Sequence, residues 1–179
     1  MIPRRLARNI IYESEWVSLY VDKIQFEDNR ILDKMHLVHY DKEAVAIVVL
    51  NDKDEVLLIK SDRYHTQSVE WEIPAGGVDE NEKPHDAAVR EAFEETGYTV
   101  ENPKFIYRYN PSNGSSDQVV NIYSARAGVK TGEPDPQEVS ETKWVSKHEI
   151  KEMLRKNEIN CGLSLIGLML VFFVGLNGD

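Results

Sequence analysis

The segment that most restricts the fold of this chain spans residues 76–98 and reads GGVDENEKPHDAAVREAFEETGY. It begins with a glycine pair that suits a turn, and then changes to a helical pattern. Pro84–Thr96 is expected to form a helix, because proline suits a first helical turn and Gly97 suits the residue just past the last one. Ala88 and Ala92, spaced by four, indicate the face of this helix that packs against the domain.

Three carboxylates gather on another face of the same helix. Glu91, Glu94 and Glu95 occupy positions i, i+3 and i+4, so their side chains are neighbours. Like charges placed this way destabilise a helix by about 0.2–0.5 kcal/mol per pair. Arg90 is adjacent in sequence and is expected to point elsewhere, so a hard divalent cation such as Mg²⁺ is the better compensation. The alternative is a solvated acidic face that binds nothing.

Around this segment the sequence alternates between extended and helical stretches. Ala44–Leu50 is an apolar run of strand length, residues 51–54 supply turn chemistry, and residues 56–59 follow as a second strand. This pattern predicts a hairpin of two central strands. The order of all stretches predicts an α/β domain with helices on both faces of a mixed sheet. The other expected strands are 10–12, 16–21, 31–39, 104–109, 119–125 and 142–145, and the other expected helices are 148–155 and 162–173.

Composition and charge narrow the class of protein. A chain of 179 residues with 41% hydrophobic residues can form one compact domain with a small appendage. The formal net charge is −10 and Lys and Arg form no block, so nucleic acid is not an expected partner. Cys161 is the single cysteine, which excludes a disulfide within the chain and favours the role of a small buried hydrophobe.

The two terminal regions indicate where in the cell the protein is expected. Arg4, Arg5 and Arg8 are basic, but no apolar stretch follows them as it would in a signal peptide. Residues 162–176 are apolar, yet they are shorter than the roughly 20 residues that span a bilayer. We therefore expect a buried C-terminal helix, a cytoplasmic protein and no membrane partner.

The spacing within residues 76–98 resembles the signature of the Nudix hydrolase family. The matching positions are Gly76, Glu82, Arg90, Glu91, Glu94, Glu95, Gly97 and the bulky Tyr98. The context matches as well, because the segment enters from a strand through a glycine turn and leaves its helix through a glycine. The resemblance implies the Nudix fold, an α-β-α sandwich around a mixed β-sheet. It also implies hydrolysis of a pyrophosphate bond in a nucleoside diphosphate linked to another group.

The resemblance assigns a role to each of these charged residues. It implies that Glu82 and Arg90 pair with each other and fix the loop against the helix. It also implies a bound Mg²⁺, or Mn²⁺ in its place, which would neutralise the diphosphate and lower the pKa of a coordinated water. The implied metal ligands are the carboxylates of Glu91, Glu94 and Glu95 and the backbone carbonyl of Ala75.

Similarity beyond this segment is to the ADP-ribose pyrophosphatase branch of the family. In that branch, N-terminal antiparallel β-strands precede the Nudix domain and commonly take part in a domain-swapped homodimer. The branch therefore implies a strand region at residues 1–42, a Nudix domain at residues 43–179, and a homodimer. The stretches that carry the similarity are Ala44–Leu50, 56–59, 63–64 and 71–76.

The same branch implies contacts with the substrate. The residues that match Arg63 and Glu72 contact the substrate there, and an arginine suits a diphosphate because its fork binds two oxygens at once. A proline follows in a later loop, and Pro111 is the candidate. Ser61 and Asp62 stand where the branch often has Gln and an aromatic residue, so the group that stacks on a base stays open. Candidates are Trp16, Tyr64, Tyr107 and Tyr109, each of which can instead be a packing residue.

A general base in such enzymes often comes from a loop far from the signature. Residues 131–141, TGEPDPQEVSE, have the composition of such a loop. Glu138 is the first candidate, Glu141 is the second, and Asp117 in another loop is the third. The alternative for Glu138 is a solvated acidic loop.

The expected reaction is the hydrolysis of ADP-ribose to AMP and ribose 5-phosphate, as the resemblance implies. The alternatives among enzymes are another nucleoside diphosphate sugar such as GDP-mannose, or a broad housekeeping activity on several such compounds. A ligand sensor of Nudix fold without turnover is a different class, but such proteins usually lack the carboxylates that Glu91, Glu94 and Glu95 supply here.

Overall fold

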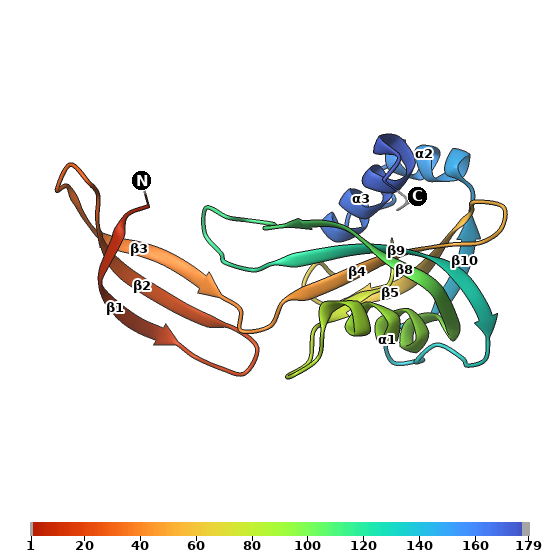
Figure 1. Ribbon diagram of the computed structural model, residues 1–179, viewed down its shortest axis with the longest axis horizontal. Coiled ribbons are helices and arrows are strands. Elements are labelled where there is room, and N and C mark those ends of the chain that lie inside the picture. The colour runs from red at the N-terminus through yellow and green to blue at the C-terminus, as the bar shows by residue number, and fades with distance from the viewer. Residues whose placement is uncertain (1, 177–179) are drawn as a thin grey trace. The chain divides into compact units, whose positions relative to one another are not determined.

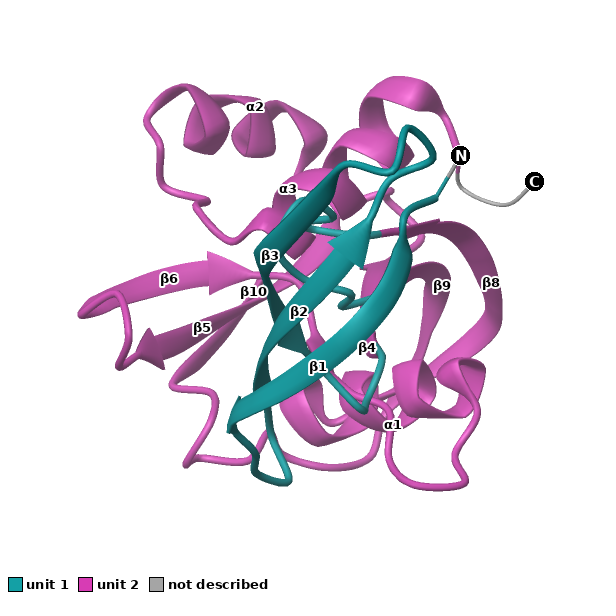
Figure 2. Cartoon of the chain, turned by 90° about the vertical axis from the view of Figure 1, so that its left-hand side faces the viewer, with its two compact units in different colours: residues 1–43, 110–119 teal, residues 44–109, 120–179 magenta. Residues whose placement is uncertain are grey.

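The computed structural model describes residues 2–176 and divides them into two compact units (Figures 1 and 2). The first unit contains the residues up to Glu43 together with Asn110–Val119, which we term the return loop. The second unit contains Ala44–Tyr109 and the chain from Val120 onward. Nothing in the sequence had indicated that the return loop belongs with the N-terminal strands.

The first unit is a three-stranded antiparallel sheet, as the sequence predicted. Its strands are β1 (Arg4–Tyr12), β2 (Ser18–Gln25) and β3 (Ile31–His39), with β2 in the middle. Side chains of β2 alternate between buried and half-buried positions, which is the pattern of a strand with one covered face. β1 and most of β3 are exposed instead.

The return loop is fastened to the end of β3. The amide of Val38 donates to the carbonyl of Ser115 at 2.8 Å, and the His39 ring meets the Asp117 carboxylate with Nδ1 at 2.5 Å. The other ring nitrogen of His39 lies 3.0 Å from Asp41. His39 therefore stands between two carboxylates, and the bond to Asp117 joins residues far apart in the sequence.

This contact predicts a pH-dependent contribution to stability. The pKa of His39 is raised above 6.5, mainly by its hydrogen bond to Asp117 and further by Asp41. A raised folded-state pKa stabilises the fold fully below the unfolded value and loses that effect as the pH rises through the raised pKa. We expect the melting temperature of His39→Gln to fall below that of wild type at about pH 6, with the gap closing by about pH 9. A gap that stays constant across that range would contradict the contact.

The second unit is built on one mixed seven-stranded sheet with the order β10-β5-β4-β9-β8. The central pair β4 and β9 is parallel, and the other pairs are antiparallel. The short strand β6 pairs with β5, and β7 pairs with β4. The bounds are β4 (Ala44–Leu50), β5 (Val56–Arg63), β6 (Ser68–Glu72), β7 (Ala75–Gly77), β8 (Tyr98–Tyr109), β9 (Val120–Lys130) and β10 (Glu141–Val145).

Helices cover both faces of this sheet, which confirms the predicted layers (Figure 1). Helix α1 (Pro84–Thr96) covers one face, with the bounds that the sequence predicted. The helices α2 (Lys147–Arg155) and α3 (Gly162–Met169) and the π-helical turn η1 (Leu170–Val174) lie on the other face. β4 serves both layers, because Val45, Ile47 and Val49 pack with the alanines of α1, whereas Ala46, Val48 and Leu50 pack with α3.

The expected central hairpin is only partly formed. β4 and β5 pair at Leu50 and Val56 and then separate. Beyond that point the edge of β4 is taken by β7, and the amide of Ile47 donates to the carbonyl of Pro74 at 2.9 Å. The two central strands therefore diverge around the turn that leads into α1, and the pocket described below opens there.

The C-terminal helix also differs from expectation. It is interrupted, since α3 passes into the π-helical turn η1, and only one side of it is buried. Val171 and Phe172 lie in the core, whereas Met169 and Phe173 are exposed. Within residues 2–176, no helix has both the length and the apolar character needed to cross a membrane.

Candidate active site

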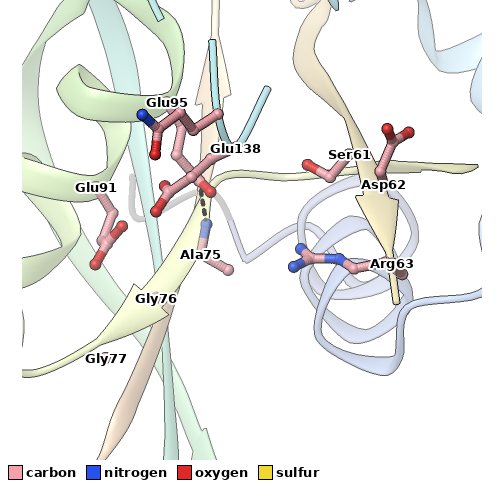
Figure 3. Close-up of a pocket in the computed structure, with 10 residues that line it drawn as sticks. Ser61, Asp62, Arg63, Ala75, Gly76, Gly77, Glu91, Glu95 and Glu138 are labelled. Atoms are coloured by element: carbon pink, nitrogen blue, oxygen red, sulfur yellow. Dashed lines mark hydrogen bonds between the residues drawn. The ribbon is translucent and has the colours of Figure 1, made fainter. Parts of the chain in front are cut away.

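One pocket of about 350 Å³ brings together five of the residues to which the sequence assigned a role in the site, namely Arg63, Ala75, Glu91, Glu95 and Glu138 (Figure 3). It lies where the end of β5, the turn at β7, the inner face of α1 and the loop before β10 come together. Its lining residues are Ser61, Asp62, Arg63, Ala75, Gly76, Gly77, Glu91, Glu95, Gln137 and Glu138.

The glycine turn sets how closely the helix approaches the strand. The Glu91 carboxylate lies directly over Gly76, and a Cβ built on Gly76 would collide with it. At the other end of α1, Gly97 adopts a left-handed φ of 74°, and a Cβ there would meet the carbonyl of Gly132. Gly97 is therefore required by the backbone, whereas a side chain at Gly76 would displace the Glu91 carboxylate from its place over the turn.

Glu95 is the most deeply buried carboxylate of the pocket, with 5% of its surface exposed. Its Oε2 accepts a hydrogen bond from the amide of Ala75 at 2.8 Å (Figure 3). The pKa of Glu95 is raised to about 8, mainly by burial and further by the nearby Glu91 and Glu138, against the lowering effect of the Ala75 amide. Burial also raises the pKa of Glu91. A bound cation would favour the charged forms of both carboxyl groups, because an opposite charge nearby lowers the pKa of an acid.

Arg90 is more closely engaged than the sequence suggested. It binds Glu82 through two hydrogen bonds of 3.0 Å, as the resemblance implied. The expectation that it points away from the carboxylate row was wrong, because Nη1 also donates to Glu91 at 2.8 Å and to Glu94 at 2.9 Å. Nη2 donates to the carbonyl of Gly77 at 2.9 Å. One guanidinium thus ties the loop, the turn and the helix together.

A divalent cation fits this site by the chemistry of its donors. Glu91, Glu95 and Glu138 bring carboxylate oxygens to one pocket, and oxygen is the ligand that Mg²⁺ and Mn²⁺ prefer. Within residues 2–176, no three acidic, His or Cys side chains lie close enough together to hold a metal ion by themselves. Arg90 bonds both Glu91 and Glu94, and Glu94 is not among the residues that line the pocket. A cation would compete with Arg90 for both carboxylates.

Arg63 lies opposite the carboxylates and contributes a positively charged side chain to the pocket lining. Its Nε and Nη2 donate to the two oxygens of Glu72 at 2.6 and 2.7 Å, and Glu72 is 3% exposed. Nη1 makes no hydrogen bond to any residue in the 2–176 range. The fork of Arg63 is therefore fixed along one edge by Glu72 and keeps a donor for a ligand.

The start of α3 supports this pair, which the sequence did not reveal. Cys161 caps α3 and is partly exposed, so it is not the fully buried hydrophobe that was expected. Burial and the adjacent Glu72 carboxylate both raise the pKa of its thiol. The amide of Ile73 donates to the buried Ser164 hydroxyl at 3.0 Å. No sequence signal pointed to these contacts, because they join residues about 90 positions apart.

Of the remaining candidates for a general base or a substrate contact, only one lines the pocket. Glu138 lies in the pocket beside Glu91 and Glu95, whereas Glu141 pairs with Lys60 at 3.2 Å outside the lining. Asp117 is engaged by His39 within the first unit. Pro111 is exposed on the return loop, and its contact with substrate stays a prediction.

The aromatic candidates lie in different environments, and one further residue lines the pocket. Tyr64 and Trp16 are 82% and 74% exposed, so neither is the packing residue that we allowed for. The phenol oxygen of Tyr109 is buried without a partner among the described residues, and burial raises its pKa to about 12. Gln137 lines the pocket without having been proposed, and its position next to Glu138 was the only signal for it.

Comparison with known proteins agrees with this geometry. The model of the NUDIX domain family matches residues 41–161. The CMP-5'-(N-acetyl-N-hydroxy-3-aminopropyl)phosphonate hydrolase of Streptomyces rubellomurinus is 30% identical over 94% of this chain and 82% of its own. The ADP-ribose pyrophosphatase of Bacillus subtilis is 28% identical over 68% of this chain and 65% of its own.

The fold has a close counterpart among solved structures. The crystal structure of an ADP compounds hydrolase superposes with a TM-score of 0.81 at 21% identity, and covers 96% of this chain and 92% of that one. The signature residues, their arrangement around one pocket and the family match lead to the same conclusion: this chain belongs to the Nudix hydrolase family, and within it resembles the ADP-ribose pyrophosphatases.

Proposed function

We propose that this pyrophosphohydrolase acts with Mg²⁺, or Mn²⁺ in its place, on ADP-ribose and releases AMP and ribose 5-phosphate. The observation that carries the proposal is the opposition of charges across one pocket. Glu91, Glu95 and Glu138 lie on one side, and Arg63 lies on the other. A pyrophosphate needs both, because its oxygens bind cations while its hydrolysis needs an activated water. ADP-ribose pyrophosphatases of Bacillus subtilis and Mycobacterium tuberculosis are among the relatives.

The proposal gives each of these side chains a separate role in the reaction. Glu91, Glu94 and Glu95, with the carbonyl of Ala75, hold the cation, which neutralises the diphosphate and acidifies a bound water when present. Glu138 accepts the proton of the attacking water, since it lines the same pocket on a loop. Arg63 binds a phosphate oxygen through its remaining donor.

A second candidate substrate is a cytidine compound. The relative with 30% identity over nearly the whole chain is named for a CMP-linked phosphonate, whereas the match to the Bacillus enzyme covers a smaller part. GDP-mannose and other nucleoside diphosphate sugars are the further alternatives, and a sensor without turnover is the last. All the catalytic alternatives place the diphosphate between Arg63 and the carboxylates.

A substrate panel tests the proposal. ADP-ribose, GDP-mannose, UDP-glucose and CDP-glucose are incubated with the enzyme and a phosphatase that releases phosphate from the products, first with Mg²⁺ and then with chelator. We expect ADP-ribose to lead by about tenfold or more in kcat/KM, which is about 1.4 kcal/mol of discrimination. A lead of CDP-glucose or GDP-mannose by that margin would transfer the proposal to that base.

Arg63 is expected to act on substrate binding. Arg63→Ala should raise KM by about 10- to 100-fold, because a charge-assisted bond to phosphate is lost and Glu72 is left buried without its cation. Arg63→Lys should recover only part of the loss, since a lysine cannot form the fork. Arg126→Ala is the matched control, as Arg126 bonds Asp54 on the surface. An unchanged KM in Arg63→Ala would remove Arg63 from the binding site.

Residues 1–42 are proposed to form a homodimer contact. Many large apolar side chains of the N-terminal strands are exposed, which is unusual for a surface that stays in water. Light scattering at micromolar concentration should give twice the mass of the 20.6 kDa chain, and Ile11→Glu should halve it. A wild-type monomer would contradict the proposal. The exposed residues are Ile2, Leu6, Ile10, Ile11, Tyr12, Trp16, Ile31, Leu32 and Met35.

The remaining expectations on location and partners stay predictions. These are a cytoplasmic location, a nucleotide as small-molecule partner, and neither nucleic acid nor membrane among the partners.

A further inference from the structure

The β5–β6 hairpin carries a second buried carboxylate, Glu70, that the proposed chemistry does not use. In the antiparallel register Ser61 stands opposite Glu70, and Arg63 stands opposite Ser68. Opposite residues of such a pair project from the same face of the sheet. Ser61 and Arg63 line the pocket, and Figure 3 shows both directed toward its carboxylate side. Glu70 therefore belongs to the face of the hairpin that supplies this pocket wall.

The contacts of Glu70 are incomplete for a buried carboxylate. Only 8% of the residue is exposed, and its Oε1 accepts from the hydroxyl of Ser68 at 2.6 Å and from that of Thr66 at 3.5 Å. Both bonds fall on one oxygen, and no residue within 2–176 donates to Oε2 or forms an ion pair with Glu70. Glu72, two residues away, has the guanidinium of Arg63 on both oxygens. Glu70 therefore has one carboxylate oxygen without a donor among the described residues, and that oxygen is available to a ligand.

The positions of Arg63 and Glu70 on this face of the hairpin indicate which kind of ligand can bind there. Arg63 reaches along the strand to Glu72, whereas Glu70 turns the other way, toward Ser68 and Thr66 near the hairpin tip. An arginine takes an anionic oxygen, and a carboxylate rejects anions and accepts hydrogen bonds from hydroxyl or amino groups. A phosphate joined to a group that bears hydroxyls or amines would match this order.

We propose that Glu70 is a specificity-determining residue that accepts a hydrogen bond from a hydroxyl or amino group of the substrate. The donor is either a sugar hydroxyl or the exocyclic amine of a base, on the part of the substrate that extends from Arg63 toward the hairpin tip. This inference rests on the proposed function, because it places the diphosphate at Arg63.

Glu70→Met removes the acceptor and keeps the side-chain volume. We expect KM for ADP-ribose to rise by about 10- to 100-fold, the effect of one hydrogen bond to a charged group, with a smaller change in kcat. Glu70→Gln should recover part of the loss, because its amide oxygen still accepts. The melting temperature of Glu70→Met should change by no more than about two degrees, since the substitution removes only an acceptor for the hydroxyls of Ser68 and Thr66 near the hairpin tip. The matched control is Glu101→Met, on an exposed position of β8.

Product inhibition identifies the donor. If Glu70 binds the nucleoside, the inhibition constant of AMP should rise in Glu70→Met by about the same factor as KM. If it binds the terminal sugar, the constant of ribose 5-phosphate should rise instead. KM and both constants within twofold of wild type would overturn the inference. A fall of several degrees in melting temperature without recovery by Glu70→Gln would overturn it too, since that pattern marks a structural role.

The substrate panel tests the proposed function independently of the experiment on Glu70. Wild-type turnover in the substrate panel decides which compound is the substrate. The comparison of Glu70→Met with wild type is then made on the compound that wild type turns over fastest, with the two products of that compound as inhibitors. A wild type that prefers another base contradicts the proposed substrate and leaves the comparison for Glu70 decisive.

Discussion

Glu95→Gln is expected to lower kcat by about a thousandfold while leaving the fold intact. Glu95 is 5% exposed and lies beside Glu91 and Glu138, so loss of its charge removes the most buried ligand of the proposed cation. The amide oxygen of glutamine can still accept the bond from Ala75 that positions this side chain. The change therefore tests charge and metal binding more than shape.

The same variant should be more stable than wild type in chelator. The pKa of Glu95 is about 8 in the folded protein, against 4.5 ordinarily. The cost of ionising it thus appears as the pH rises from 4.5 through 8, and is absent below 4.5. Calorimetry should show a melting temperature several degrees above that of wild type at about pH 9, and an equal one at about pH 4.

Mg²⁺ should reverse this order. At about 100 times its dissociation constant, a cation that binds only the folded state adds about 2.7 kcal/mol to the stability of wild type. It should add far less to Glu95→Gln. Full activity of Glu95→Gln in Mg²⁺, or equal stabilisation of both proteins by the cation, would remove Glu95 from the metal site.

Arg90→Ala is expected to be the most damaging change outside the carboxylates. It removes the hydrogen bonds that join Glu82, Gly77, Glu91 and Glu94, and it leaves the negative charges of the helix without their guanidinium. Because Glu91 and the side chain of Glu82 are mostly buried, the free energy of unfolding should fall by about 2–4 kcal/mol. The pKa of Glu91 should rise further, since Arg90 lowers it in the wild type.

Urea denaturation in chelator measures this loss. Arg126→Ala serves as the control, because it removes an exposed arginine that contacts Asn51 and Asp54. Arg90→Lys should recover little, as one ammonium cannot replace the fork toward Glu82. Mg²⁺ should restore part of the stability of Arg90→Ala, because it supplies the missing positive charge. A stability within 0.5 kcal/mol of the control, roughly the scale of a surface change, would contradict the role given to Arg90.

The sequence was most informative where the pattern is local. Helix α1 begins and ends where its proline and glycine indicated, and Glu91 and Glu95 share a face because the helical period requires it. The pairing of Glu82 with Arg90 was accessible because a family resemblance carried it. The contacts of Arg90 with Glu91 and Glu94 were not, since they depend on which rotamer a long side chain adopts once the glycine turn is in place.

Contacts between segments far apart in the chain could not be predicted from the hydrophobic pattern of the sequence. The fastening of Asp117 to His39 and the pairing of Arg63 with Glu72 depend on loop paths and strand register, which hydrophobic periodicity does not encode. The incomplete hairpin of β4 and β5 has the same origin, since β7 competes for the edge of β4. Glu70 escaped notice because a single glutamate in a polar strand carries no signal until its burial is known.

The central claim is metal-dependent cleavage of a pyrophosphate bond at the pocket of Glu91, Glu95 and Arg63. The direct measurement is chromatographic separation of the products of ADP-ribose, with Mg²⁺, with chelator, and with Glu95→Gln in Mg²⁺. We predict equal amounts of AMP and ribose 5-phosphate in the first reaction, and almost wholly intact ADP-ribose in the other two at the time when wild type with Mg²⁺ has consumed half of it. Cleavage at the wild-type rate in chelator or in Glu95→Gln, or the absence of AMP in the first reaction, would contradict the account.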